Sequence, residues 1–204
     1  IWFGWFGFLD DWVRDFSPFA PVTALIFFAI LFLISDLINT PFSLYQNFVI
    51  EARFGFNKMT LKTYFSDKLK GYFLTAFLGG GLLLVFVWMI EVTGADFWWY
   101  FWIVITVFLL ALNMLYTSLL LPLFNKLVPL EDGKLKKSIA DFAEKVSFPL
   151  TQVFVIDGSK RSSKGNAFFS GLGKKKKVVL YDTLIAKHNV DELTAVFAHE
   201  VGHY

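Results

Sequence analysis

Two histidines and a glutamate near the end of this 204-residue chain have the types and the spacing of a hydrolytic metal centre. His199 and His203 enclose Glu200 in the pattern H-E-x-x-H. Residues four apart on a helix lie one turn apart on the same face, so the two imidazoles can bind a single zinc ion. Glu200 would lie beside that ion, where a carboxylate can take a proton from an attacking water. The pattern therefore predicts zinc-dependent hydrolysis of peptide bonds.

The alternative interpretation is a chance H-E-x-x-H on an ordinary helix. These two histidines, however, are two of only three in the chain, and the third, His188, lies too early in the sequence to be expected at the same ion. Asn189 and Glu192 have the spacing of a helix capping box. Apolar residues follow on the side opposite the histidines. They are Leu193, Phe197 and Val201. The local pattern thus favours a metal-binding helix.

The composition indicates that this helix belongs to a membrane protein. Hydrophobic residues make up 56% of the chain and charged residues 18%, with a mean hydropathy of +0.56. This is too apolar for an ordinary soluble domain. Three stretches reach the length of about 20 apolar residues that a bilayer requires. They are residues 18–38, 72–90 and 97–121. The aromatic cluster that opens the third stretch is typical of a membrane interface.

The charged residues predict which side of the membrane each loop occupies. The loop at 39–71 carries Arg53 and four lysines against Glu51 and Asp67, so the positive-inside rule makes it cytoplasmic. The connection at 91–96 has no Lys or Arg, as expected of the outer side. After the third span the chain returns inside, which places the H-E-x-x-H helix on the cytoplasmic side. The chain has no Cys, which excludes disulfides and thiolate ligands, and a net charge of +2 does not indicate a nucleic-acid partner.

From residue 122 onward the pattern changes to that of a smaller polar domain. We therefore divide the chain into a transmembrane region at 1–121 and a second region at 122–204. The spacing of apolar residues predicts a helix over 134–146. Runs of β-branched and aromatic residues predict three short strands, arranged as a hairpin or small sheet just before the H-E-x-x-H helix. These runs are 152–156, 165–171 and 177–181.

Several segments resemble, in the same order, those of one protein family. They are residues 40–45 (TPFSLY), 51–57 (EARFGFN), 122–126 (PLFNK), 166–168 (NAF) and 199–203 (HEVGH). The chain closely resembles the type 1 CAAX prenyl endoproteases, which are multispanning membrane zinc metalloproteases, and its short loops are more similar to those of the bacterial members. The resemblance implies a mainly α, polytopic transmembrane protein. In this family seven spans form an α-barrel around a water-filled chamber, with a small cytoplasmic α/β hairpin region and a zinc-site helix.

The resemblance also implies roles for individual residues. His199 and His203 would bind one zinc ion, and Glu200 would be catalytic. Asn166, Ala167 and Phe168 match an edge strand along which an extended peptide substrate pairs main chain to main chain, although an ordinary packed hairpin strand is the alternative. The family's third zinc ligand is a Glu downstream of Tyr204. The region 122–204 would then be the start of a zinc metallopeptidase domain, incomplete at its C-terminal end.

Polar residues within the predicted spans have two interpretations. They are Asp36, Asn39, Asn113 and Thr117. If the chamber exists, such groups can line it, since polar groups at membrane depth are tolerated where they face water or protein. Alternatively, each caps the end of a span or bonds to a neighbouring helix.

The predicted function is that of a membrane-embedded zinc metalloendopeptidase of the CAAX prenyl protease type. Its partners would be the lipid bilayer and a peptide or protein substrate, with a prenylated C-terminus as one option. A heat-shock-type membrane quality-control metalloprotease is the alternative enzyme. A membrane transporter or scaffold with an unused metal motif is the alternative without catalysis. The bacterial inner membrane is the favoured location and the endoplasmic reticulum the alternative.

Overall fold

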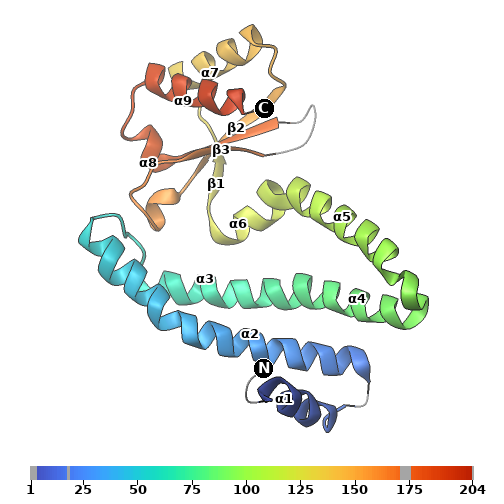
Figure 1. The fold of residues 1–204 in the computed structure, drawn as a ribbon. Helices are drawn as coiled ribbons and strands as arrows, with labels where there is room; N and C mark the ends of the chain where they lie inside the picture. The colour runs from blue at the N-terminus through green and yellow to red at the C-terminus, as the bar shows by residue number, and fades with distance from the viewer. Residues whose placement is uncertain (1–3, 18, 171–175, 204) are drawn as a thin grey trace. The chain divides into compact units, whose positions relative to one another are not determined.

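The computed structural model describes residues 4–17, 19–170 and 176–203 (Figure 1). The chain divides into two compact units, Ile1–Val49 with Phe65–Val107 and Ile50–Tyr64 with Phe108–Tyr204. Residue 18, where the first predicted span begins, and residue 171, where the predicted strand at 165–171 ends, lie outside the described residues.

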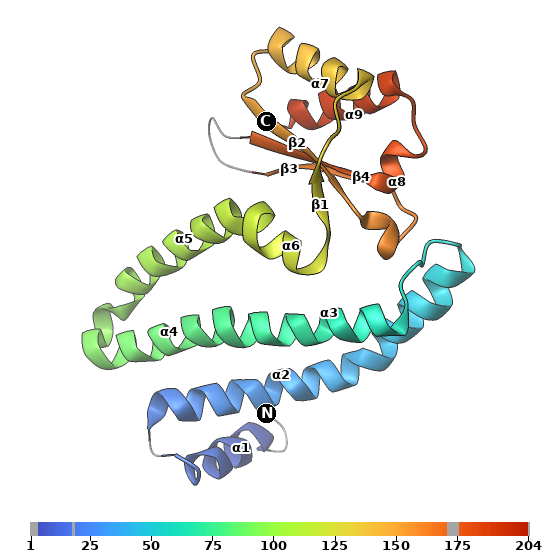
Figure 2. The same ribbon diagram turned by 180° about the vertical axis from the view of Figure 1, so that it is seen from behind.

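The first unit is helical. Its elements are α1 (Trp5–Arg14), α2 (Ala20–Tyr45), η2 (Thr75–Gly79), α4 (Gly80–Thr93) and η3 (Gly94–Asp96), with most of α3 (Leu61–Leu74) and the first part of α5 (Phe97–Leu115). Within the described part of the chain, two continuous helical stretches are long and apolar enough to cross a membrane, Ala20–Glu51 and Leu61–Phe124. The second stretch includes both predicted spans 72–90 and 97–121. The chain turns between them at Gly94, whose φ is 56° (Figure 2).

Much of the segment predicted as a cytoplasmic loop, 39–71, is helical instead. The π-helix η1 (Gln46–Glu51) continues α2, and α3 already begins at Leu61. Polar side chains at this end of α2 are compatible with the helix, because they find partners on its own backbone: Asn39 Nδ2 donates to the carbonyl oxygen of Ser35 at 2.7 Å. The prediction of a loop was wrong here, because a polar sequence does not by itself end a helix when its polar side chains find hydrogen-bond partners within that helix.

Asp36 connects two helices of the first unit. Its carboxylate lies 2.8 Å from Lys68 Nζ of α3 and accepts a hydrogen bond from the Tyr72 hydroxyl. Lys68 also donates to Thr40 Oγ1. Of the two interpretations of Asp36, the structure thus shows a bond to a neighbouring helix. A charged group at membrane depth is tolerated when it is paired in this manner.

A small sheet forms the centre of the second unit. Among the described residues it has four strands, β1 (Leu127–Pro129), β2 (Leu150–Ile156), β3 (Ala167–Ser170) and β4 (Lys176–Tyr181), in the order β1-β2-β4-β3. β2 and β4 run parallel, whereas β1 pairs with β2 and β3 pairs with β4 in antiparallel fashion. The three predicted strands correspond to β2, β3 and β4, and β1 was not predicted. β3 lies at one edge of the sheet.

The two faces of the sheet have separate apolar clusters. The helices α7 (Lys134–Lys145) and α9 (Val190–Gly202) lie side by side on one face (Figures 1 and 2). The buried residues of that cluster are Ile139, Ala143, Phe148, Val153, Ala167, Val178, Leu180, Leu184, Leu193 and Phe197. A smaller cluster of Leu121, Ile156 and Val179 covers the other face. Successive strand residues point to opposite faces, which explains why Val178 and Val179 belong to different clusters.

Candidate active site

The helix that carries H-E-x-x-H begins with the capping box that the sequence predicts. Asn189 Oδ1 accepts a hydrogen bond from the backbone N–H of Glu192 at 2.9 Å, and Glu192 Oε2 accepts one from the backbone N–H of Asn189 at 3.0 Å. The second bond, together with His188 Nδ1 at 3.2 Å, holds the pKa of the Glu192 carboxyl below its ordinary value. This end of the helix is therefore fixed by local contacts.

Two apolar side chains anchor α9 to the sheet. Leu193 is 2% exposed and Phe197 is fully buried. The ring of Phe197 packs edge-on against those of Phe142 and Phe148. Burying an aromatic or aliphatic side chain of this size contributes about 1.5–3 kcal/mol to folding. Because this stripe faces the sheet, the opposite side of the helix carries the two histidines away from the core.

The two histidines of the motif converge. The Nε2 atoms of His199 and His203 lie 3.2 Å apart, with ring centroids 4.7 Å apart and ring planes at 88°. Two nitrogens bound to one tetrahedral zinc at about 2.0–2.1 Å would lie about 3.3 Å from each other. Both side chains are exposed, and Glu200 between them in sequence is half-buried. The side chains present thus fit a zinc ion at this end of α9.

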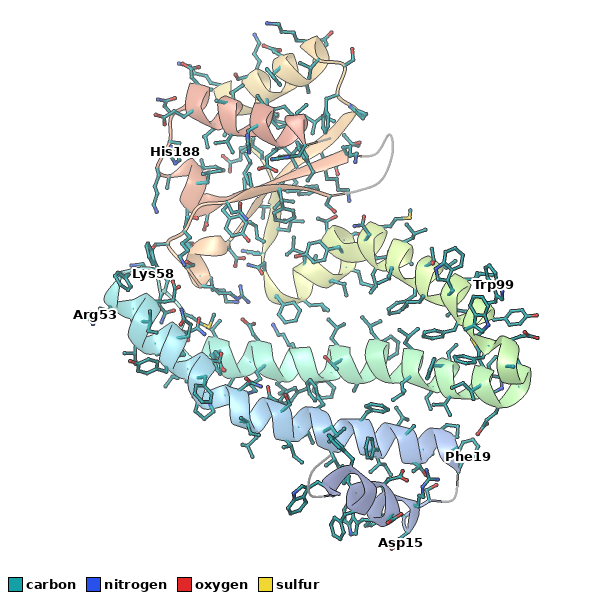
Figure 3. The ribbon with its side chains drawn as sticks, in the orientation of Figure 1. Asp15, Phe19, Arg53, Lys58, Trp99 and His188 are labelled. Atoms are coloured by element: carbon teal, nitrogen blue, oxygen red, sulfur yellow. The ribbon has the colours of Figure 1, made fainter. Side chains whose placement is uncertain are left out.

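The described residues contribute only this pair to a metal site. Among residues 4–17, 19–170 and 176–203, no group of three or more His, Cys, Asp or Glu side chains is placed to hold a metal ion. His188 precedes α9 and lies toward α8 (Asp182–Ile185), as Figure 3 shows. Since a helix of 13 residues is about 20 Å long, His188 is remote from His203 at the other end.

The edge strand β3 lies next to α9. The ring of Phe169 packs against Phe197 of the helix, with centroids 5.8 Å apart. Asn166 immediately precedes the strand, and its carbonyl oxygen accepts a hydrogen bond from the backbone N–H of Tyr181 at 3.0 Å. In an antiparallel ladder such bonded pairs alternate with pairs whose N–H and C=O groups point away. The backbone groups of Ala167 and Phe169 therefore point to the free edge of the sheet.

Phe168 lies on the face of the sheet opposite the H-E-x-x-H helix. Its ring centroid is 6.3 Å from that of Tyr116 and 6.4 Å from that of Tyr181. Burial raises the pKa of the Tyr181 phenol, and the neighbouring Tyr116 adds to this effect. The side chains of Phe168 and Phe169 thus pack as in an ordinary strand, which was the alternative interpretation. The side chain of Asn166, just before the strand, is exposed.

Sequence reasoning missed the contacts that hold this strand. The hydroxyls of Thr117 and Ser170 lie 2.8 Å apart, and both residues are buried. Thr117 was predicted to line a chamber, to cap a span end or to bond to a neighbouring helix, and its partner is instead a strand residue. At the other end of the strand, Lys164 pairs with Glu51. These partners are 53 and 113 residues apart in the sequence, and no local pattern indicates them.

Long apolar helices and an H-E-x-x-H helix beside an edge strand are the features expected of a family of membrane peptidases. Family models agree along the chain. Residues 1–126 match the model described as the CAAX prenyl protease N-terminal region with five membrane helices, and residues 129–204 match peptidase family M48. The protein therefore belongs to peptidase family M48, in its CAAX prenyl protease branch, and is an integral membrane protein.

Similar proteins are named as CAAX prenyl proteases. CAAX prenyl protease 1 of Saccharomyces cerevisiae is 45% identical over 186 residues, which are 89% of this chain and 40% of the relative. The Arabidopsis thaliana homologue is 43% identical over 83% of this chain and 40% of the relative. The human homologue is 39% identical over 86% of this chain and 37% of the relative. The chain thus spans about two fifths of the length of the relatives it matches.

A solved structure shows the same fold. The crystal structure of S. mikatae Ste24p superposes with a TM-score of 0.85 at 44% identity, covering 89% of this chain and 43% of that one. The relatives named above are eukaryotic, so the expected likeness to bacterial members finds no support in them.

Proposed function

We propose that this protein is a zinc-dependent membrane endopeptidase in which His199 and His203 bind the metal ion. The observation that carries the proposal is the 3.2 Å separation of their Nε2 atoms on the exposed side of α9. The family resemblance adds a third ligand, a Glu downstream of Tyr204. Bound zinc supplies Lewis acidity that makes water a nucleophile near neutral pH.

Glu200 is the general base of the proposed reaction. Its carboxylate takes a proton from the attacking water and passes a proton to the nitrogen of the leaving amine. The position of Glu200 directly after His199 supports this role, because the carboxylate is carried on the same helical turn as the first ligand. The side chain of Glu200 is only half-buried, which supports its access to water and substrate.

The edge strand β3 aligns the substrate. An extended peptide would pair with the outward backbone groups of Ala167 and Phe169, as in other cases of β-strand addition. Asn166 adds a polar side chain at the start of the strand, where its exposure supports a contact with substrate. Phe168 contributes its backbone position and the packing behind it. Such alignment places a scissile bond beside α9, the step that converts binding into reaction.

The substrate class follows from the relatives. Their name, CAAX prenyl protease 1, supports a peptide or protein with a prenylated C-terminus as the substrate. The eukaryotic relatives favour the endoplasmic reticulum membrane over the bacterial inner membrane. The distribution of lysine and arginine supports a cytoplasmic H-E-x-x-H helix. A seven-span barrel around a wet chamber belongs to the same proposal, since hydrolysis within a membrane requires access for water.

Elemental analysis tests the metal site. The purified full-length protein is expected to contain one equivalent of zinc, and the His199→Ala variant is expected to lose it. Lys136→Met on α7, which changes a side chain remote from the motif in sequence, serves as the control and should retain the metal. Full zinc content in the His199→Ala variant would refute the proposed ligand set.

A further inference from the structure

The segment that leads into β3 is held from two sides. On one side, Ser163 donates its backbone N–H to the carbonyl oxygen of Phe56 at 2.9 Å and its hydroxyl to that of Gly55, also at 2.9 Å. On the other side, Thr183 Oγ1 of α8 donates to the carbonyl oxygen of Lys164 at 2.8 Å. The backbone just before the edge strand is thus fixed by hydrogen bonds from two separate parts of the sequence.

The side chain of Lys164 adds a charged contact to this arrangement. Its Nζ lies 3.0 Å from Glu51 Oε1 and 2.9 Å from Glu51 Oε2, so the ammonium lies between the two carboxylate oxygens. The same Nζ lies 4.7 Å from the centroid of the Phe56 ring, at the distance of a cation–π contact. Figure 3 marks Arg53 and Lys58, which lie in the stretch of chain around Phe56.

The ion pair between Lys164 and Glu51 is too exposed to water to stabilise the fold much, which favours a positioning role. The side chain of Lys164 is 53% exposed and that of Glu51 is 24% exposed. An ion pair so open to water contributes little to the stability of a fold. Its two partners nevertheless fix the direction of a chain whose next residues are Gly165, Asn166 and Ala167. At Gly165 the backbone passes close to α8, because a Cβ there would meet the Cα of Leu184 at 3.1 Å.

We infer that Lys164 is a positioning residue for the substrate strand, acting through its contacts with Glu51 and Phe56. The inference rests on the proposed function, in which Asn166 and the edge of β3 receive an extended peptide. Lys164 lies two residues before Asn166 and contacts no part of the proposed metal site. Loss of its contacts would let the entry to the strand move and would weaken binding of the peptide, because the strand would have to be ordered again in the complex, with little effect on the chemistry at Glu200 once the peptide is bound.

Steady-state kinetics on the full-length protein with a farnesylated CaaX peptide test the inference. Lys164→Met keeps the methylene chain and removes the charge, and Glu51→Gln removes the partner charge at constant shape. Each is expected to raise KM roughly two- to fivefold, the range that loss of an exposed ion pair allows, because a strand entry that has become mobile must be ordered again when the peptide binds; kcat should change less than about twofold. Lys164→Arg, which keeps both the ion pair and the ring contact, should retain the wild-type KM.

Two controls distinguish positioning from general damage. Lys136→Met breaks an exposed pair between Lys136 of α7 and Asp132 just before the helix, in which Lys136 Nζ lies 2.6 Å from Asp132 Oδ1, and should leave KM unchanged. The exchanged pair Glu51→Lys with Lys164→Glu should recover most of the lost affinity. The midpoint of thermal unfolding should be the same for every variant.

The outcomes separate the inference from the proposed function. If the wild type cleaves the peptide and Glu200→Gln does not, the proposed function stands whatever Lys164 does. An unchanged KM in Lys164→Met and Glu51→Gln would then overturn the inference alone. The inference would also be overturned if the variants lowered kcat instead of raising KM, or if Lys164→Arg raised KM as much as Lys164→Met. A raised KM accompanied by a lower unfolding midpoint would overturn it as well. A wild type that retains one zinc but cleaves no peptide would refute the proposed function itself, and the inference would fall with it.

Discussion

The hydroxyl of Thr117 lies 2.8 Å from the hydroxyl of Ser170, and both groups are shielded from water. Thr117 belongs to the π-helical segment η4 (Tyr116–Leu120), and Ser170 is the last residue of β3. A strand at the edge of a sheet has only one neighbouring strand to hold it. This bond therefore fixes the far end of β3, while Asn166 and the residues before it fix the near end.

Replacing Thr117 with Val should destabilise the protein by about 1–3 kcal/mol, because it leaves the Ser170 hydroxyl buried without its partner. The double variant Thr117→Val/Ser170→Ala should cost less than the sum of the single changes, since neither polar group then remains. Denaturant unfolding of the detergent-solubilised protein measures both effects. Thr106→Val is the matched control, because the Thr106 hydroxyl is bonded at 2.7 Å to the carbonyl oxygen of Trp102 in its own helix and is exposed. If the losses of unfolding free energy caused by Thr117→Val and Ser170→Ala simply added in the double variant, the result would contradict a hydrogen bond between the two hydroxyls.

The parts of the fold that local patterns determine were predictable. The capping box at Asn189, the apolar stripe through Phe197 and the helical spacing of the histidines are all written within 15 residues of sequence, and α9 forms as expected. The strands β2 and β4 were predictable for the same reason, since β-branched runs are local signals.

The parts that depend on distant partners were not predictable. β1 has three residues, one of them Pro129, and it is a strand only because it pairs with residues 154–156 of β2. The sequence also could not show which face of the sheet Phe168 lies on. Phe168 and Phe169 are both apolar, so either side chain could have packed on the face that α9 covers. Lys164 likewise finds its partner 113 residues away.

The stability contributed by the start of α9 should decrease in acid. The pKa of Glu192 is held below its ordinary value of 4.5, first by the backbone N–H of Asn189 and then by His188. The pKa of Glu192 is thus lower in the folded protein than in the unfolded chain. The ionised carboxylate therefore stabilises the fold at pH values above the unfolded-state pKa. This stabilisation is lost as the pH falls through the folded-state pKa. Between pH 7 and pH 3 the unfolding midpoint of the wild type should therefore fall further than that of Glu192→Gln. An equal fall in both proteins would show that Glu192 contributes no pH dependence.

Glu200→Gln should abolish most hydrolysis while leaving zinc in place. The substitution keeps the shape of the side chain and removes the proton acceptor, and loss of a general base typically lowers the rate by about 100-fold or more. Zinc content measured on the same sample should stay at one equivalent, because His199 and His203 are unchanged. Cleavage at the wild-type rate would exclude Glu200 as the base. Absence of cleavage in both the wild type and Glu200→Gln would instead favour the interpretation of a transporter or scaffold with an unused metal motif.

Asn166→Ala should weaken substrate use without weakening the fold. The backbone carbonyl of Asn166, which accepts the hydrogen bond from Tyr181, is retained in the variant, so the ladder between β3 and β4 persists. The lost amide can remove one hydrogen bond to a bound peptide, an effect of about 0.5–1.5 kcal/mol, equivalent to a decrease in kcat/KM of roughly 2- to 13-fold. Kinetics with a farnesylated peptide and thermal unfolding of the same preparation measure the two quantities side by side. A lowered unfolding midpoint with kcat/KM unchanged would instead assign Asn166 to the structure of the strand, and the polar contact with substrate would have to come from another residue along the same edge.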